Sequence, residues 1–441
     1  MRNLIAPALF GVACLFWSGG VGLAPAVAQT RVPAGTIAPQ TTVRVTGNPA
    51  TAAFIRTVAA AAARAAAQLT PGARIALDPD SVEGARDLAL SDVLTVNVPL
   101  QLNSGDDGAY FSVVGWTRVR VENVALPHIR PKQLVVSDYP EQLRENGVLF
   151  ATTLDRSAGS QRFFYYHDNP ADQPARRILL RANNASPQPA VLQFISGEGG
   201  PEPSGMEAGH LSTLRFLARV AQNEGNVIVI PPNATATLVD QPLPPGNVVS
   251  NLLQLRELEG DPVEVTLIAQ GASDSAGRPV NPTGLLQSAV KHARGVYRVP
   301  EFSYDYAYDI GSDRPLEIPI GVLPLPNLRE GEVLGGDYGV LQSIALTVRN
   351  PTNSEAPIAL YENPRGGSAT GTYIIDLTLV QSHAAAAFSK WKLRQYRVPP
   401  HGVLRISVVT MPEGGSSYPV RLIVAPDDGS APPGSPASPV Y

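Results

Sequence analysis

Most apolar residues of this chain lie in short runs that have the pattern of β-strands. From about residue 131 onward, runs rich in Val, Ile, Leu and Tyr alternate with clusters of Pro, Gly and Asn, as short strands joined by turns do. The runs are 147–154, 161–167, 178–183, 190–195, 226–231, 234–240, 262–269, 295–299, 302–308, 340–349, 356–361, 372–380, 393–398, 402–410 and 418–425. The pattern predicts a mainly β protein.

Two segments have helical spacing instead. Residues 51–68 are dense in Ala, the strongest helix former, and Thr51 can cap their first turn. Residues 206–222 follow a Ser-x-x-Glu capping box formed by Ser204 and Glu207, and their Leu residues recur on one face. We expect one helix near the N-terminus and one helix among the later strands.

The first 28 residues resemble a secretory signal. Arg2 gives a positive start, 4–17 is mostly apolar, and Ala26-Val27-Ala28 is an A-x-A cleavage site. Cys14, the single cysteine of the 441 residues, would be removed with the signal. The mature chain would then have neither disulfides nor cysteine-bound metals. No later segment is apolar enough to span a membrane, so we expect an exported protein that is periplasmic, secreted or held at the cell surface.

Two blocks of the chain resemble each other, with four landmarks in the same order. Each has two strands joined by a turn that begins at Asn, then a glycine pair, a Pro-Pro corner between two strands, and a Pro-Val strand. The paired segments are 178–195 with 344–362, Gly199-Gly200 with Gly366-Gly367, 227–238 with 396–406, and 262–269 with 419–425. This order indicates an internal duplication, in which Asn184 corresponds to Asn350.

Each such strand has one apolar face, which a second sheet has to cover. The run of strands, Asn turn and Pro corner over about 131–426 resembles the immunoglobulin-like β-sandwiches of exported bacterial proteins, and this resemblance implies a fold rather than a reaction. We therefore expect two tandem immunoglobulin-like β-sandwich domains. The expected division is a signal peptide (1–28), a small α+β N-terminal region (29–130), sandwich 1 with its inserted helix (131–287), sandwich 2 (288–426) and a disordered tail (427–441).

The chemistry of the chain gives few candidates for catalysis. A Gly-x-Ser-x-Gly motif is absent, and no two of the six histidines lie within five positions of each other. Glu207 and His210, one helical turn apart, are weak candidates for a shared metal ion. No cofactor is expected, and catalysis is the less favoured interpretation. A secreted carbohydrate-active hydrolase with a carboxylate pair stays an alternative, because the sequence cannot single out two of 38 acidic residues.

Aromatic residues give the candidate binding site. Phe302, Tyr304, Tyr306 and Tyr308 alternate with polar or small residues, so a strand would place all four rings on one face. Such a face either stacks on sugar rings or packs into a core, and core packing is the favoured interpretation. By contrast, the consecutive run 163–166 predicts a strand that is buried on both sides.

These observations favour a non-catalytic structural or binding protein of the bacterial cell envelope. A glycan-binding surface protein that uses the tyrosine stripe is an alternative. The partner would be an envelope polysaccharide or another surface protein. The formal net charge of −4 argues against nucleic acid, which requires a basic face.

Overall fold

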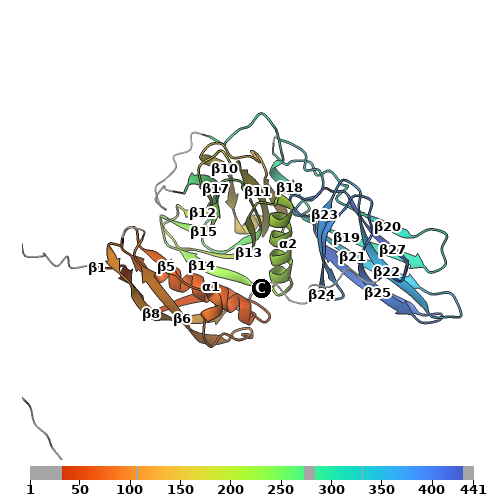
Figure 1. Cartoon of the computed structure of the whole chain (residues 1–441), viewed down its shortest axis with the longest axis horizontal. Helices are drawn as coiled ribbons and strands as arrows, with labels where there is room; N and C mark the ends of the chain where they lie inside the picture. The colour runs from red at the N-terminus through yellow and green to blue at the C-terminus, as the bar shows by residue number, and fades with distance from the viewer. Residues whose placement is uncertain (1–31, 106–107, 273–283, 330, 431–441) are drawn as a thin grey trace, which may run out of the picture.

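The computed structural model describes residues 32–105, 108–272, 284–329 and 331–430. Strands dominate it, together with two helices, α1 (Ala52–Ala66) and α2 (Gly205–Ala221). Figure 1 shows three parts in a row: N-terminal strands with α1, a first group of strands with α2, and a second group in blue. Within the described ranges, no helix is long and apolar enough to cross a bilayer. The predicted signal peptide (1–28) lies outside these ranges.

Both predicted helices are present. The Thr51 side chain accepts the Phe54 N–H at the start of α1, and the Ser204 side chain accepts the Glu207 N–H at the start of α2, as helix caps do. Helix α1 covers the inner face of the N-terminal strands. These strands are β1 (Val32–Pro33), β2 (Gly35–Thr36), β3 (Gln40–Thr46), β4 (Gln68–Leu69), β5 (Arg74–Ala76), β6 (Val93–Asn103), β7 (Tyr110–Phe111) and β8 (Val113–Asn123).

The remaining strands form two sets of nine, with one further strand between them. The first set is β9 (Gln133–Ser137), β10 (Gly147–Leu154), β11 (Gln161–Asn169), β12 (Arg176–Asn184), β13 (Ala190–Glu202), β14 (Gly225–Ile230), β15 (Ala234–Leu243), β16 (Asn247–Glu259) and β17 (Val263–Gly271). The second set is β19 (Glu301–Asp309), β20 (Leu316–Ile320), β21 (Leu341–Arg349), β22 (Ala356–Pro364), β23 (Ala369–Ile375), β24 (Thr378–Ala385), β25 (Trp391–Val398), β26 (Val403–Thr410) and β27 (Val420–Pro426). Between them lies β18 (Arg294–Arg298), which pairs with β9 although it follows the predicted boundary at 288.

The two sets have the same strand order in both of their sheets. The four-stranded sheets run β10-β17-β12-β15 and β20-β27-β22-β25. The other sheets contain β9-β11-β16-β13-β14 and β19-β21-β26-β23-β24, and in each the first pair is parallel. In the first set this sheet continues through β3, β8, β6 and β5, because β3 pairs with the outer edge of β14.

The register of the strands also repeats. In the pair β12·β15 the register shifts between Leu180 and Arg181, and in the corresponding pair β22·β25 it shifts between Leu360 and Tyr361. A β-bulge is a specific local feature of a strand pair, and its recurrence at the same place fixes which residues correspond. The structure therefore contains one strand pattern twice.

This register corrects the phase of the repeat that the sequence indicates. Asn350 corresponds to Asn169 rather than to Asn184. Asn169 ends β11, and Asn350 directly follows β21, the equivalent strand of the second set. Their side-chain amides donate to the carbonyls of Leu243 and Val398, which end the equivalent strands β15 and β25. The side-chain amide of Asn184, at the end of β12, donates in the same way to the carbonyls of Ile230 and Pro231, at the Pro-Pro corner that follows β14. The first set thus contains two such asparagine corners, at Asn169 and at Asn184. The sequence pattern matched Asn350 with the second of them, whereas the first is its equivalent.

The two sets differ in the connection between their equivalent strands β13–β14 and β23–β24. In the first set α2 fills this connection. In the second set the connection is a tight turn at Asp376 and Leu377, which both have positive φ, as the central residues of the commonest two-residue hairpins do. The single strand predicted over 372–380 is therefore wrong, since it is two strands of a hairpin.

The central strands of the first set are covered on both faces. Phe163 and Tyr165 face the core between the two sheets, whereas Phe164 and the partly buried Tyr166 face α2 and the second set. The predicted burial of 163–166 on both sides is confirmed. β16, which the pattern of strands did not predict, is buried along almost its whole length for the same reason.

The predicted disordered tail begins with ordered residues. Asp427 and Asp428 pair with Lys392 of β25, and the structure describes the chain as far as Ser430. Residues 431–441 lie outside the described part.

The asparagine corner gives a stability prediction. Asn350 is 2% exposed, and its amide donates to the carbonyls of Ser354, Val398 and Pro399, where the chain passes between sheets. We expect Asn350→Ala to lower the free energy of unfolding by about 1–3 kcal/mol, measured by urea denaturation. The control Asn353→Ala, at an exposed turn position, should cost less than about 0.5 kcal/mol. Equal losses in the two variants would contradict this role.

Candidate functional site

The predicted aromatic stripe lies on β19, at the edge of the five-stranded sheet. The four side chains alternate with exposed residues, and neighbouring rings from Phe302 to Tyr306 lie with their centroids 6.1 Å apart. Tyr308 is 4% exposed in the core of the second set, and Tyr304 and Tyr306 pack against that core. Phe302 packs against the cluster beside α2. The stripe thus has the geometry of a partly covered core edge.

His210 is part of a buried polar cluster between α2 and the second set. Its Nδ1 lies 2.9 Å from Glu413 Oε2, and its Nε2 lies 2.9 Å from Gln381 Oε1. Glu413 also accepts hydrogen bonds from the hydroxyls of Thr370 and Thr372, at 2.5 and 2.6 Å. Neither of these contacts involves Glu207, and the metal candidate Glu207–His210 stays a prediction.

The close packing of α2 on the second set depends on glycines. A Cβ on Gly209 of α2 would lie 1.7 Å from the carbonyl oxygen of Gly414. Gly415 has a φ of +72°, and a Cβ there would lie 2.4 Å from the carbonyl oxygen of Gly205. A side chain at either position would push the helix away from the loop that carries Glu413.

The pKa shifts of His210 and Glu413 are those of a buried ion pair. Burial lowers the pKa of His210, but the charge and hydrogen bond of Glu413 outweigh it and raise the pKa to about 9. Burial opposes ionisation of Glu413, but His210 and the two threonines hold its pKa below the usual value. Glu362 lies nearby, is fully buried, and burial raises its pKa to about 8, so it is mostly protonated at neutral pH. The cluster therefore holds one buried ion pair and one neutral acid, an arrangement that joins two parts of the fold.

A second buried ion pair joins the same two parts. Arg162 of β11 is fully buried, and its Nη2 donates to Glu301 Oε1 at 2.9 Å, at the start of β19. Its Nη1 donates to the carbonyls of Pro300 and Gly339 at 2.7 and 3.3 Å. These bonds reach across 138 to 177 residues of sequence, so the pattern of strands could not predict them.

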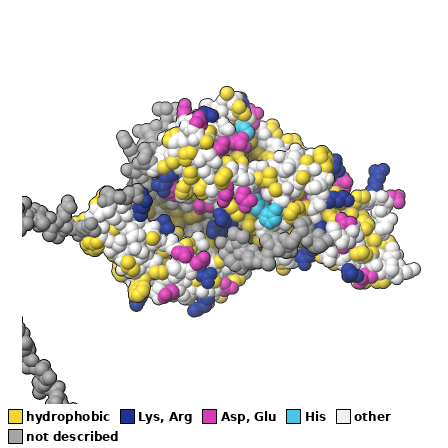
Figure 2. All heavy atoms as spheres, in the orientation of Figure 1, with side chains coloured by type: hydrophobic (Ala, Val, Ile, Leu, Met, Phe, Trp, Pro, Cys, Tyr) yellow, Lys and Arg dark blue, Asp and Glu magenta, His cyan; other side chains and the backbone are white. Residues whose placement is uncertain are grey.

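A cleft of about 630 Å³ opens between α1, α2 and the strands β13, β14 and β15. Figure 2 shows a hollow in this region, with apolar atoms on its floor. β14 pairs with β13 only as far as Phe194. Beyond that point, the carbonyls of Ser196 and Glu198 accept hydrogen bonds from Arg219 and Arg215 of α2. The two arginines thus cover the free edge of β13 inside the cleft.

Two carboxylates line this cleft. Burial raises the pKa of Glu198, and the charges of Arg219 and Arg215 oppose that rise. Burial also raises the pKa of Glu224, whose Oε1 accepts the Thr51 N–H at 2.6 Å at the start of α1. Glu224 therefore has a structural role as a helix cap, which leaves Glu198 as the carboxylate with no such role.

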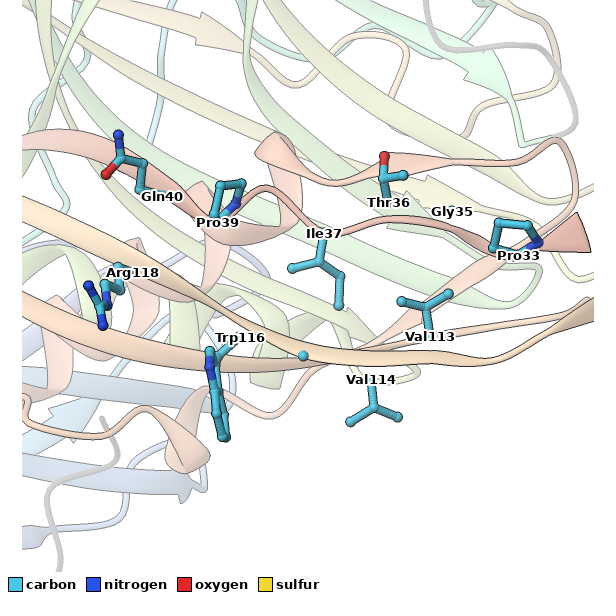
Figure 3. Close-up of a pocket in the computed structure, with 11 residues that line it drawn as sticks. Pro33, Gly35, Thr36, Ile37, Pro39, Gln40, Val113, Val114, Trp116 and Arg118 are labelled. Carbon is cyan, nitrogen blue, oxygen red and sulfur yellow. The ribbon is translucent and has the colours of Figure 1, made fainter.

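A second hollow, an open groove of about 740 Å³, lies between residues 33–40 and β8. Figure 3 shows Trp116 and Val114 projecting from the same side of β8, with Ile37 opposite the strand. Trp116 is 69% exposed. Gly115 leaves room between the two segments, since a Cβ there would come within 3.2 Å of Ile37. No part of the strand pattern indicated this groove. The available signal was a Trp at a position that the alternation of the strand predicts to be exposed.

The outer face around Trp116 is mostly polar. Trp116 pairs across the sheet with Pro99, and the exposed Arg118 pairs with Asn97 on one side and Gln40 on the other. An exposed indole within a rim of amides and a guanidinium can stack on a flat apolar surface while the rim donates hydrogen bonds.

Three described side chains lie close enough together to be candidate ligands of one metal ion. Asp138, Glu141 and His292 each offer one ligand atom, and these atoms lie within 4.8 Å of one another. The sequence did not indicate this group, because His292 is separated from the two acids by some 150 residues.

Comparisons with known proteins give no family. No protein-family model matches the chain, and no curated protein matches it. Among solved structures, tripeptidyl peptidase 2 aligns at 11% identity and a TM-score of 0.17, over 81% of this chain, which spans 29% of that protein. The tandem CBM22 domains of Xyn10C from Paenibacillus barcinonensis align at 9% identity and a TM-score of 0.13, over 82% of this chain and 92% of that one. Lac15 from a marine microbial metagenome aligns at 10% identity and a TM-score of 0.11, over 91% and 85%.

The His210–Glu413 pair predicts a pH dependence of stability. Folding raises the pKa of His210 from 6.5 to about 9, so its stabilisation is complete below about pH 6.5 and is lost as the pH rises towards 9. We expect the melting temperature of His210→Gln to be lower at pH 6 and to fall less between pH 6 and 9.5 than that of the unmodified protein. Thermal unfolding followed by circular dichroism measures this. The exposed His401→Gln serves as control, and parallel curves for His210→Gln and the unmodified protein would contradict the assignment.

The position of Tyr306 predicts a loss of stability on truncation. Its ring packs against the core of the second set, so Tyr306→Ala should lower the free energy of unfolding by about 1–2 kcal/mol. The measurement is denaturant unfolding of the full chain. An unchanged midpoint would show that the ring is a free surface and would restore the stripe as a binding candidate.

Proposed function

We propose that the chain is an exported, non-catalytic binding protein of the bacterial cell envelope, and that it binds an envelope polysaccharide on the outer face of β8. The observation that carries the proposal is the exposed Trp116 beside an open groove. Exposed apolar patches with a polar rim are typical of interaction sites.

The chemistry of this face suits a sugar chain. One face of a pyranose ring carries C–H groups and stacks on an indole, while its hydroxyls need donors and acceptors at the edge of the ring. Gln40, Asn97 and Arg118 supply such groups beside Trp116.

The rest of the fold supports a rigid carrier for this face. We propose that the two strand sets are tandem immunoglobulin-like sandwich domains that arose by duplication, which their shared strand order and register support. The buried pairs His210–Glu413 and Arg162–Glu301 hold the second set against the first. The A-x-A site at 26–28 supports export, and N-terminal sequencing of the secreted product tests it, with Gln29 as the expected first residue.

The hydrolase alternative has weaker support. The cleft beside α2 does contain two carboxylates with raised pKa values, as a pair for acid and base catalysis would. However, Glu224 already accepts the backbone N–H of Thr51, the N-cap of α1, and so holds the start of that helix.

The proposal predicts that Trp116→Ala abolishes polysaccharide binding and leaves stability unchanged. Affinity electrophoresis of the secreted chain in gels that contain dextran, alginate or soluble cell-wall polysaccharide measures retention. We expect at least a tenfold loss of affinity with an unchanged melting temperature, since the ring is mostly exposed.

Phe388→Ala is the matched control, because Phe388 is also an exposed aromatic residue, 66% exposed, but lies in the second set. Equal retention of both variants, or no retention of the unmodified chain on any of these polymers, would overturn the glycan assignment.

A further inference from the structure

The strands β9 and β18 bring together three side chains that the proposed function does not use. Asp138 directly follows β9, Glu141 lies three residues later, and His292 precedes β18. β9 and β18 are antiparallel, and the Asp138 N–H donates to the Ala293 carbonyl at 2.9 Å. The three side chains therefore come from two backbone segments that are hydrogen-bonded to each other beside the site.

The backbone at Glu141 is fixed as well. The Glu141 carbonyl accepts the Asp168 N–H at 2.8 Å, and the Leu143 N–H donates to the Asp168 carbonyl at 2.8 Å. This loop is thus tied to the end of β11, so the ligand backbone would need little reorganisation on binding an ion. Preorganisation of this kind lowers the cost of binding.

The donor atoms have the separations that a small cation requires. His292 Nε2 lies 3.1 Å from Glu141 Oε2, and His292 Nδ1 lies 3.5 Å from Asp138 Oδ2. Ligands of a tetrahedral zinc ion are about 3.3 Å apart, given bond lengths of about 2.0–2.2 Å. The imidazole lies between the two carboxylates with one nitrogen towards each. One ligand atom from each of the three residues lies within 4.8 Å of the others, so a small rotation of these side chains would bring both carboxylates and one nitrogen around a single ion, which would replace the proton on that nitrogen.

One oxygen of the group is left without a partner. Asp138 Oδ1 is buried and accepts no hydrogen bond from any described residue. A buried carboxylate oxygen in this state is costly. A divalent cation would supply the missing contact.

Access and coordination number also fit. The three side chains are between about a quarter and a third exposed, so an ion can enter from solvent and keep water as a further ligand. A nitrogen donor beside two carboxylates favours zinc or manganese over calcium and magnesium, which prefer oxygen ligands throughout.

We propose that Asp138, Glu141 and His292 form a binding site for one divalent transition-metal ion, with Zn²⁺ the preferred occupant. The ion would link the end of β9 to the start of β18, the strand through which the chain passes from the first set to the second. The site is independent of the Trp116 face.

Isothermal titration of the full secreted chain with ZnCl₂, after treatment with EDTA, tests the proposal. We expect one zinc ion per chain, a higher melting temperature with zinc that EDTA reverses, and at least a tenfold weaker affinity in both Asp138→Asn and His292→Gln. Equimolar CaCl₂ should not raise the melting temperature.

His128→Ala is the control, because His128 is an exposed histidine that would bind zinc only adventitiously. Circular dichroism of the metal-free variants shows whether they fold. His292→Gln, a change at a partly exposed side chain, keeps the test valid if Asp138→Asn does not fold. Zinc binding that is absent in the unmodified chain, or that is weakened by His128→Ala and unchanged in His292→Gln, would overturn the site.

Discussion

The organisation of the molecule depends on how the outer face of the first set is covered. The sheet that contains β16 and β13 packs with one face on its own sandwich partner, and its other face is apolar as well. Helix α2 and residues of the second set fill that face, in a cluster that includes Phe164, Phe216 and Met411. Removal of this cover would expose the apolar face to water, so its burial favours contact between the two strand sets.

The buried polar groups between α2 and the second set fix the relative position of the two strand sets. A buried ion pair adds little net stability unless its hydrogen bonds are complete, but it strongly disfavours any arrangement that separates the partners. His210 and Glu413 meet this condition, with Gln381, Thr370 and Thr372 as further partners. The glycines of α2 and of the loop at 414–415 allow the backbones to approach closely enough for these bonds to form. Apolar packing thus holds the parts together, and the polar groups fix their relative position.

The sequence predicted the strands well where one face of a strand is exposed to solvent, and poorly where both faces are buried. β10 and β19 were found within a residue at each end, because turn residues bound both and exposed positions alternate along β19. β16 was missed, since it is covered on both faces and its apolar run has no alternation. The repeated strand pattern was recognised but aligned one strand out of phase, because Asn169 and Asn184 make the same corner and only the register of β12 and β22 distinguishes them.

The sequence by itself determined the β-rich class, both helices with their caps, and the presence of a repeated strand pattern. These depend on local rules: side-chain period, turn residues and the first turn of a helix. Only the tertiary structure decided which chemistry the side chains take part in. His210 pairs with Glu413, 203 residues away, and Asp138 and Glu141 meet His292 across an antiparallel strand pair. A contact between residues so far apart depends on how the sheets pack, and the pattern along the chain carries no information about which distant side chain arrives.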